Sequence, residues 1–413
     1  MAAKRFLVLG CTALVMVAVF LVISCLSAGN ANLPHWDSGD WPPGHHSYND
    51  APNPNPRGWE NRPGQWELVW RDEFNGTELN LDNWNIETGT GAQFGTTGTG
   101  SPFGLAGWGN YEAQYYRKDN VSVRNGMLVI EARNDGHVGS WWQHYPLPAG
   151  AVQREMPFTS GKVTTGGTRA SNTYCALHSD CTGIPDCAGC VLSEKFSISE
   201  GFIEARIRAP RGEGFWPAFW TLGTNANRYG NGGSEAHVAW PRSGEIDIME
   251  MRGGQEYLHV STIHHGMSFP YRRWFPGNTL DVRNVLPQGV DMANGFHVYG
   301  VWWDENNIHF YFNGWNWFSI DLRRLQGGPS ANAAAFTYHL GQFININLAV
   351  GGNFIQRAEP GPALFAASAS PYDRSLMVDW IRVYRKVGGN SVVRIHGEVI
   401  PCSGNNAGLT NER

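Results

Sequence analysis

The sequence predicts an all-β protein in which two antiparallel sheets pack face to face. Short runs that alternate apolar and polar residues recur along the chain, for example WELVWRDEF, GFIEARIRAP, FHVYGVWWDENNIHFYFNG and LMVDWIRVYRK. Long helical periods are absent from the sequence. Glycine is frequent, with 51 residues, and glycine-rich turns suit an architecture of many strands. Because one sandwich can include the whole patterned stretch, we expect a single domain over residues 65–388.

Two tight hairpin turns can be located within this stretch. The pairs Asn125-Gly126 and Asn313-Gly314 each separate two alternating runs. Asn-Gly is the strongest short-range indication of a β-hairpin, because both residues of the favoured turn have positive φ. Each pair therefore predicts two neighbouring strands joined by a two-residue loop.

Composition argues against one class of partner. The chain of 413 residues has a net charge of −5, only 16% charged residues and no block rich in Lys or Arg. Phosphate binding needs clustered Lys and Arg, so we expect no nucleic acid partner. Aromatic residues are abundant, with 18 Trp, 20 Phe and 14 Tyr. We expect most of them in the core and some along a groove, where a flat ring can stack on a sugar.

The N-terminal residues form a targeting segment. Lys4 and Arg5 precede an apolar run that ends near Leu26, and small residues follow up to Ala31. We expect residues 1–31 to be a signal peptide, removed when the protein is secreted. The apolar run is nearly long enough to span a bilayer, so the alternative is a retained membrane anchor.

Two further segments flank the predicted domain. Residues 32–64 are rich in Pro, Asn, Gly and His and lack apolar periodicity, which indicates a linker rather than a second domain. Residues 389–413 are predicted to be a polar tail without a lipid-anchor signal. In a eukaryotic secretory pathway, the sequons at Asn75 and Asn120 are acceptors for N-linked glycans.

Four cysteines crowd into the segment CALHSDCTGIPDCAGC. Zinc binding is one interpretation of the CxxC spacing, but an oxidising compartment favours two local disulfides. Their pairing has three possibilities that the sequence leaves open. Cys402 is left over, either free or in an intermolecular bond. The four clustered residues are Cys175, Cys181, Cys187 and Cys190.

Three carboxylates in the run SGEIDIME break the alternation of a strand. Isoleucine alternates with acid, so Glu245 and Asp247 share one face. The next residue on that face should be Met249, yet the third acid is Glu250. A β-bulge at Ile248 or Met249 would return Glu250 to the face of the other two acids. In the alternative, Glu250 faces the opposite way and forms a surface ion pair.

Clustered acids of this kind indicate a function. Three acids on one partly buried face are costly unless they share protons or hydrogen bonds. Glycoside hydrolysis is the chemistry that uses paired carboxylates. The run therefore predicts a glycosidase site.

The run SGEIDIMEMRG resembles the catalytic strand of glycoside hydrolase family 16, in the bulged form of its laminarinase-like branch. Other stretches resemble the family in the same order, namely LVWRDEFNG, GWGNYEAQYY, FWPAFWTLG, STIHHG, FHVYGVWW, NLAVGGN and MVDWIRVY. The resemblance covers about residues 66–386. It implies a β-jelly roll with a concave substrate groove, and endo-acting, retaining hydrolysis of β-1,3-glucans or of related β-1,3/1,4-glucans.

The resemblance also implies residue roles. Glu245 is similar to the nucleophile, Glu250 to the general acid/base and Asp247 to the residue that holds the nucleophile. No cofactor is required for this chemistry. A structural calcium ion on the convex side would be held by Glu73, the Gly126 carbonyl and Asp379.

Substrate contacts follow from the same resemblance. Trp240 and Trp216 are expected in the groove, and Asn110 at its edge. His264 is expected to reach the substrate, whereas His265 is expected to be structural. Two residues keep two interpretations: Trp220 lies in the groove or in the core, and Asn347 contacts a sugar or has a structural role.

Two alternatives to a secreted β-glucanase stay open. The first is a non-catalytic or dual-role β-glucan recognition protein, as found among animal relatives of the family. In such proteins the catalytic acids are typically replaced, whereas here Glu245, Asp247 and Glu250 are all present. The second is a transglycosylase, which shares the catalytic residues. In each case the expected partner is a β-glucan, bound by a monomer.

Overall fold

The computed structural model describes the predicted domain in several stretches. The leader, most of the linker, the cysteine cluster and Cys402 lie outside these stretches, so the predictions made for them stay predictions. The described residues are 64–90, 106–141, 152–167, 194–224, 240–241, 243–266, 273–274, 276–325, 341–366 and 369–400.

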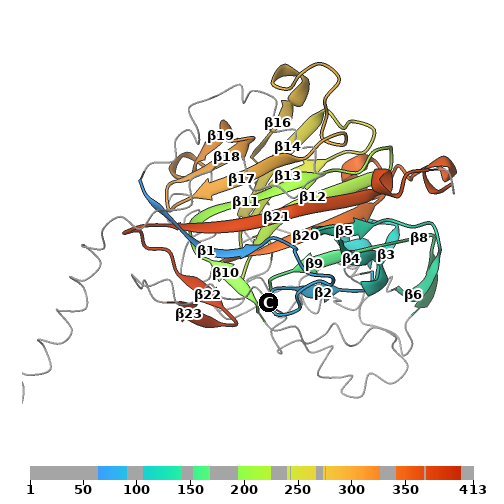
Figure 1. The fold of residues 1–413 in the computed structure, drawn as a ribbon, viewed down its shortest axis with the longest axis horizontal. Coiled ribbons are helices and arrows are strands. Elements are labelled where there is room, and N and C mark those ends of the chain that lie inside the picture. Colours follow the sequence, from blue (N-terminus) through green and yellow to red (C-terminus); the bar gives the residue numbers. More distant parts are fainter. Residues whose placement is uncertain are drawn as a thin grey trace, which may run out of the picture.

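The first of the two main sheets has eight strands. Their order is β19-β18-β17-β11-β21-β5-β4, and β1 also pairs with β21, all antiparallel. The long strand β21 crosses the molecule between β11 and β1 (Figure 1). The strands are β1 Trp66–Asp72, β4 Val121–Arg124, β5 Met127–Glu131, β11 Gly201–Arg208, β17 His297–Trp303, β18 Asn307–Phe312, β19 Trp315–Asp321 and β21 Ser375–Lys386.

The second sheet has eleven strands and carries the acidic run. Its main order is β15-β14-β13-β12-β20-β10-β22-β23, with β16 on β14, and with β2 joined through β9 to β20. Its strands are β2 Asn85–Glu87, β9 Lys162–Thr164, β10 Phe196–Ile198, β12 Phe215–Gly223, β13 Glu245–Met251, β14 Leu258–Gly266, β15 Arg273–Trp274, β16 Gly277–Asp281, β20 Gln342–Val350, β22 Val393–Ile395 and β23 Glu398–Ile400.

The remaining elements are small. Strands β3 Gln114–Tyr116 and β8 Phe158–Ser160 form a parallel pair, and β6 His137–Trp141 and β7 Val152–Met156 form an antiparallel pair. None of the helices in the described part of the chain is long and apolar enough to cross a membrane. The short 3₁₀ helices are η4 Ala106–Gly109, η5 Lys118–Asn120, η7 Val282–Asn284, η8 Leu322–Arg324, η9 Asn353–Ile355, η10 Pro362–Phe365 and η11 Pro371–Arg374.

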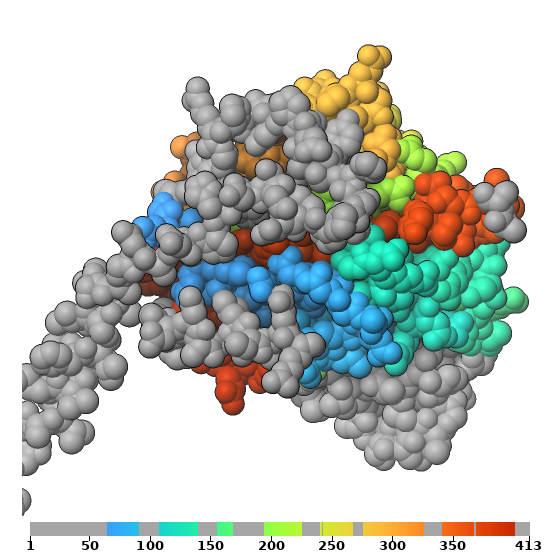
Figure 2. Space-filling model, viewed as in Figure 1, coloured from blue at the N-terminus to red at the C-terminus, as the bar shows by residue number. Residues whose placement is uncertain are grey.

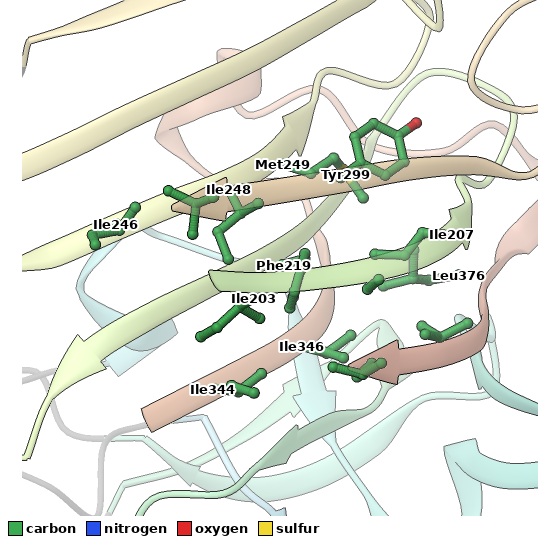
Figure 3. Close-up of a cluster of buried hydrophobic side chains, with 14 of the residues drawn as sticks. Ile203, Ile207, Phe219, Ile246, Ile248, Met249, Tyr299, Ile344, Ile346 and Leu376 are labelled. Atoms are coloured by element: carbon green, nitrogen blue, oxygen red, sulfur yellow. The ribbon is translucent and has the colours of Figure 1, made fainter. Parts of the chain in front are cut away.

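The hydrophobic core lies between the two sheets. Side chains of β12, β13 and β20 meet side chains of β11, β17 and β21 in one continuous cluster (Figure 3). Burial of this apolar surface holds the sheets together. Every second residue of β20 belongs to the cluster, from Ile344 to Val350, so the residues between them point away from the core. This alternation confirms the predicted all-β sandwich.

Both predicted hairpin turns are confirmed. Asn125 and Gly126 join β4 to β5 with φ values of 54° and 72°. Asn313 and Gly314 join β18 to β19 with φ values of 49° and 81°. These are the positive values that the favoured two-residue turn requires.

The end of the predicted domain differs from the structure. The first strand, β1, begins at Trp66, and in the space-filling view the blue stretch 64–90 lies against the teal stretch from 106 onward (Figure 2). Beyond the predicted boundary at residue 388, however, β22 pairs with β10 and β23 pairs with β22. Val393 is fully buried in the core cluster. The prediction that the polar tail starts at 389 is therefore wrong, because residues 393–400 extend the larger sheet.

Candidate active site

A β-bulge in β13 brings the three acids to one face. On β14, Thr262 pairs with Asp247 and Val260 with Glu250, so three steps along β13 oppose two steps along β14. On β12, neighbouring residues pair with Met249 and Asp247, which leaves Ile248 as the extra residue. The predicted bulge is confirmed. The extra residue shifts the alternation by one, so the side chains that follow it on β13 point to the opposite face from the one that a regular strand would give them.

The burial of β13 shows how the bulge works. Ile248 and Met249 are consecutive, yet both are fully buried in the core cluster (Figure 3). Glu250 therefore points to the side opposite the core, as Glu245 and Asp247 do. We call this side of β9, β12, β13, β14 and β20 the site face. It is the face on which the substrate groove was predicted.

Glu245 accepts a hydrogen bond at one carboxylate oxygen and faces a histidine at the other. The indole Nε1 of Trp240 donates to Oε2 at 3.0 Å. The Nε2 atom of His264 lies 3.5 Å from Oε1. His264 stands directly opposite Glu245 in the β13–β14 ladder, and its ring lies 5.5 Å from that of Trp240, centroid to centroid. The structure thus brings together Trp240, His264 and Glu245, as predicted.

Asp247 shares the same histidine. Its Oδ2 atom lies 2.9 Å from His264 Nε2. Glu245, Asp247 and His264 each offer one atom that could bind a metal ion, and these three atoms lie within 4.8 Å of one another. The side chain of Asp247 is 7% exposed, so its carboxylate depends on His264 rather than on water.

Glu250 is held by a different tryptophan. The indole Nε1 of Trp216 donates to Glu250 Oε1 at 2.9 Å. Trp216 lies on β12 two residues from Ala218, which pairs with Glu250, so it reaches the acid diagonally across the ladder. An indole N–H is a donor only, and this contact leaves Oε2 of Glu250 to other partners.

Burial and repulsion between their negative charges raise the pKa values of the three acids. Burial raises the pKa of each of Glu245, Asp247 and Glu250 to about 8, and the charge of Asp247 adds to the effect on the two glutamates. The charge of His264 and the tryptophan N–H groups act in the opposite direction on Glu245 and Glu250. Because each charge changes the pKa of its neighbours, the ionisation of the three acids is linked.

A chain of hydrogen bonds crosses the site face beside the acids. Trp220 Nε1 donates to Asn347 Oδ1 at 2.7 Å, and Asn347 Nδ2 donates to the Tyr116 hydroxyl at 3.1 Å. That hydroxyl donates to Glu112 Oε2 at 3.2 Å, and Gln114 Nε2 donates to the same oxygen at 2.6 Å. Asn347 thus uses both ends of its amide within the protein, which supports the structural interpretation of this residue.

A buried ion pair lies next to this chain. Lys162 Nζ contacts Glu87 Oε2 at 2.8 Å, and both side chains are almost fully buried. The same ammonium lies 4.2 Å from the ring centroid of Trp108 and 5.1 Å from that of Trp220. Trp220 is partly exposed on the site face, so the prediction that placed it in the groove rather than the core is the better of the two.

The remaining predicted contacts divide as follows. Asn110 is partly exposed at the edge of the site face, and its Nδ2 lies 3.4 Å from Glu112 Oε1. His265 is buried on the core side, which agrees with a structural role.

Sequence reasoning missed Glu112, Gln114 and Tyr116. Their spacing of two within NYEAQYY, starting from Asn110, is the strand period that could have revealed them.

The residues predicted to hold calcium do not fit such a site. Both oxygens of Glu73 bind Arg382, at 2.8 and 2.9 Å. Asp379 binds Arg206 at 2.6 Å. Since each carboxylate is already neutralised by a guanidinium group, a cation there would have to displace two ion pairs. The donor set expected from the resemblance is therefore used for salt bridges in this chain.

The two predicted glycosylation sites differ. Asn75 is exposed, in agreement with an acceptor role. Asn120 is buried, and its Nδ2 donates to the Glu131 carbonyl at 2.8 Å and to Thr159 Oγ1 at 3.0 Å. The prediction of a glycan at Asn120 is wrong for the folded protein, because the nitrogen that would carry the sugar is engaged inside it.

An antiparallel β-sandwich with three clustered carboxylates on one sheet face has the features of a glycoside hydrolase. Comparison with family models agrees, because residues 115–332 match the model for "Glycosyl hydrolases family 16". The chain is 31% identical over 299 residues to "Glucan endo-1,3-beta-glucosidase" of Cryptopygus antarcticus, covering 70% of this chain and 83% of that protein. The chain belongs to glycosyl hydrolase family 16.

Two further comparisons agree with this membership. The chain is 30% identical over 321 residues to "Glucan endo-1,3-beta-glucosidase A1" of Niallia circulans; the match covers 77% of this chain but only 38% of that protein. Among solved structures, the endo-beta-1,3-glucanase of Pyrococcus furiosus superposes with a TM-score of 0.54 at 28% identity, covering 79% of this chain and 97% of that one. These neighbours support the predicted jelly roll.

Proposed function

We propose that the protein is a secreted, endo-acting, retaining β-glucanase that hydrolyses β-1,3-glucosidic bonds, with mixed β-1,3/1,4-glucans as a second substrate class. The observation that carries the proposal is the bulge at Ile248, because it gathers three carboxylates beside two tryptophan N–H donors. Two proteins similar to this chain bear the name of glucan endo-1,3-beta-glucosidase, which points to the same bond.

The neighbours of the two glutamates suggest their roles. Glu245 accepts a hydrogen bond from Trp240 at one oxygen and lies 3.5 Å from His264 at the other, and both neighbours favour its ionised form. An ionised carboxylate is what a nucleophile needs. Among the residues that the structure describes, Trp216 is the donor to Glu250 and it binds Oε1, so Oε2 is the atom to hold a proton. A protonated carboxyl is what a general acid needs.

The reaction then has two steps. Glu250 gives its proton to the leaving glycosidic oxygen while Glu245 attacks the anomeric carbon and forms a covalent glycosyl-enzyme. Glu250, now a carboxylate, takes a proton from water, which attacks the same carbon and releases Glu245. Asp247, through His264, holds the nucleophile and limits the negative charge on the site face.

The stereochemistry of the product tests the proposal. Proton NMR during the first minutes of laminarin digestion should show the β anomer at the new reducing end, followed by slow mutarotation. Mixed oligosaccharides should appear early, and the viscosity of a long glucan should fall before much sugar is released. An α anomer appearing first would contradict retention, and glucose as the sole early product would contradict internal cleavage. Lichenan, agarose and chitin in parallel digestions define the accepted linkages.

Two other functions use the same site. A transglycosylase would give products longer than its substrate, and size analysis of the same digests detects them. A recognition protein would bind laminarin without cleaving it. We favour an enzyme over a recognition protein because all three acids are present and each has a hydrogen-bond or ion-pair partner.

Secretion and a monomeric state belong to this proposal. The mature protein should be found outside the cell without residues 1–31. N-terminal sequencing of the protein from the medium and from the membrane fraction tests the first point, and a chain that starts at Met1 in the membrane fraction would favour the anchor. Sedimentation of the secreted protein tests the second.

A further inference from the structure

The tryptophan that binds Glu250 is itself held by a stack of two side chains. The ring of Phe354, in η9, stacks on the indole of Trp216 with centroids 5.0 Å apart and planes inclined by 28°. The guanidinium of Arg252, which follows β13, lies 3.9 Å from the Phe354 ring centroid. Arg252 Nε also donates to the Phe354 carbonyl at 3.0 Å. The order of the stack is therefore Arg252, Phe354 and Trp216.

A glycine completes the support of the indole. Gly352 has a φ of 93°, and a Cβ atom at this position would lie 3.0 Å from two carbons of the Trp216 ring. The backbone thus comes closer to the indole than any other residue would allow. Phe354 covers one face of the Trp216 ring, and the backbone of Gly352 lies close to the ring as well. Less of the ring is therefore available to stack on a sugar than the sequence prediction assumed. Its N–H group, in contrast, is aimed at Glu250.

We propose that Arg252 and Phe354 are positioning residues for the acid/base: they lock the indole of Trp216, and the indole fixes the carboxyl of Glu250. This inference rests on the proposed function of Glu250 and adds residues that touch neither substrate nor the reacting atoms. The stack ties three elements together, because Arg252 follows β13, Trp216 lies on β12 and Phe354 lies in the loop after β20.

The consequence for the chemistry follows from the donor character of an indole. Trp216 Nε1 can only donate, so Oε1 of Glu250 must act as an acceptor. The transferable proton is then confined to Oε2. A loosened indole would let the carboxyl rotate and hold its proton on either oxygen. Acid catalysis would weaken, whereas attack by Glu245 would not depend on the stack.

Substrates with different leaving groups separate these two effects. Cleavage of laminarin needs acid assistance, but a dinitrophenyl β-glycoside of laminaribiose has a leaving group that departs without a proton. kcat/KM reports the glycosylation step for both. Phe354→Leu keeps apolar bulk but removes the flat ring, and Arg252→Gln removes the charge and the stack. For each variant we expect kcat/KM on laminarin to fall about tenfold relative to kcat/KM on the aryl glycoside, the size of one lost charge-assisted hydrogen bond.

A matched control lies in the same loop. Arg357 stacks on Tyr111 at 4.0 Å and resembles Arg252 in chemistry, but its contacts are with Tyr111 and Asn353 rather than with Trp216 or Glu250. Arg357→Gln should leave the ratio of the two kcat/KM values unchanged. A variant that merely disturbs the fold lowers both values equally, so equal losses in Phe354→Leu and Arg252→Gln, or no loss, would overturn the inference. Should Arg252→Gln fail to fold, Phe354→Leu decides alone.

Glu250→Gln distinguishes failure of this inference from failure of the proposed function. It should abolish laminarin cleavage and retain glycosylation by the aryl glycoside. If Glu250→Gln keeps full activity on laminarin, the acid/base assignment itself is wrong. If Glu250→Gln behaves as expected and the ratio in Phe354→Leu does not move, only the positioning role is rejected.

Discussion

Glu245 and Glu250 are identical side chains on one strand, and their neighbours make them different. Glu245 lies between Trp240 and His264, with the Trp240 N–H donating to one oxygen and His264 3.5 Å from the other. Glu250 accepts a hydrogen bond from Trp216 at one oxygen. In the proposed mechanism, this difference in contacts is the reason for assigning the attack to Glu245 and the proton delivery to Glu250.

Neutral replacements test the two roles. Glu245→Gln and Glu250→Gln preserve the size and shape of the side chain, so the fold should persist while laminarin cleavage falls by about 10²–10⁴ or more. In Glu250→Ala, azide should restore turnover of an activated substrate and give a β-glycosyl azide. An α-azide from that variant would show that the roles are reversed, and full activity of either glutamine variant would remove the assignment. Circular dichroism of each variant controls for folding.

Asp247 gives a prediction that links activity to stability. Burial raises its pKa to about 8, above the ordinary value of 3.8. The folded state therefore binds a proton that the unfolded state releases, and the stability this proton provides is present below about pH 4 and is lost as the pH rises through 8. Asp247→Asn is neutral at every pH. Its Tm should exceed that of the wild type by an amount that grows from pH 4 to pH 8, while activity is lost.

Thermal unfolding at several pH values measures this difference. Each kcal/mol corresponds to about 1.5 °C in a domain of this size. A Tm difference that is constant from pH 4 to pH 8 would contradict the raised pKa of Asp247. The comparison with the wild type cancels the contributions of all other titrating groups that the substitution does not touch.

At the scale of residues, the sequence predicts the three acids but not all of the side chains that hold them in place. Glu250 was visible because it breaks an alternation. Trp216 and Trp240 are expected in the groove through the resemblance to the family. Phe354 and Arg252 were not, since their contact with the site depends on how the loop after β20 folds back onto β12 and β13, and no local pattern reports such a contact.

At the scale of elements, the bulge is the feature on which the site depends. A regular strand has a period of two, and the sequence EIDIME cannot place its acids on one face with that period. The single extra residue, Ile248, solves this and lets two consecutive apolar side chains enter the core. The sequence was sufficient to predict a bulge at Ile248 or Met249, but only the register of β12 identified Ile248.

Alanine substitutions test the bulge directly. In an unbulged strand one of Ile248 and Met249 would lie on the site face, and its truncation would cost little. In the bulged strand both are buried, so Ile248→Ala and Met249→Ala should each lower the free energy of unfolding by about 2–5 kcal/mol. Denaturant titration measures both values. A near-zero cost at either position would be incompatible with the observed register.

At the scale of the whole molecule, alternation and turn chemistry were enough to predict a sandwich. They were not enough to predict its edges. The segment 393–400 is short, and the strand pairing that attaches it to β10 is a long-range interaction with a strand almost 200 residues earlier. The acids expected to hold calcium also have long-range partners, because Asp379 pairs with Arg206 and Glu73 with Arg382.

The space between the sheets also contains two neutral histidines. His259 on β14 is fully buried against Tyr299 and Trp317, with ring centroids 5.1 Å from each. Burial lowers its pKa to about 3 and that of His297, which is also buried, to about 4. Below about pH 6.5, both histidines are therefore protonated in the unfolded state but stay neutral in the folded state. The two histidines should destabilise the sandwich as the pH falls from 6.5 towards 4.

His259→Phe should weaken this acid sensitivity. Phenylalanine keeps an aromatic ring in the same contacts and cannot take a proton. Ser261, whose hydroxyl lies 3.4 Å from His259, still donates to the Ile248 carbonyl at 2.8 Å, so the change leaves no unsatisfied hydroxyl. The Tm of the variant minus the Tm of the wild type should increase as the pH falls from 7 to 4. Only the wild type loses stability over this range by keeping His259 neutral in the folded state. Parallel Tm curves over this range would mean that His259 does not contribute to the acid lability of the fold.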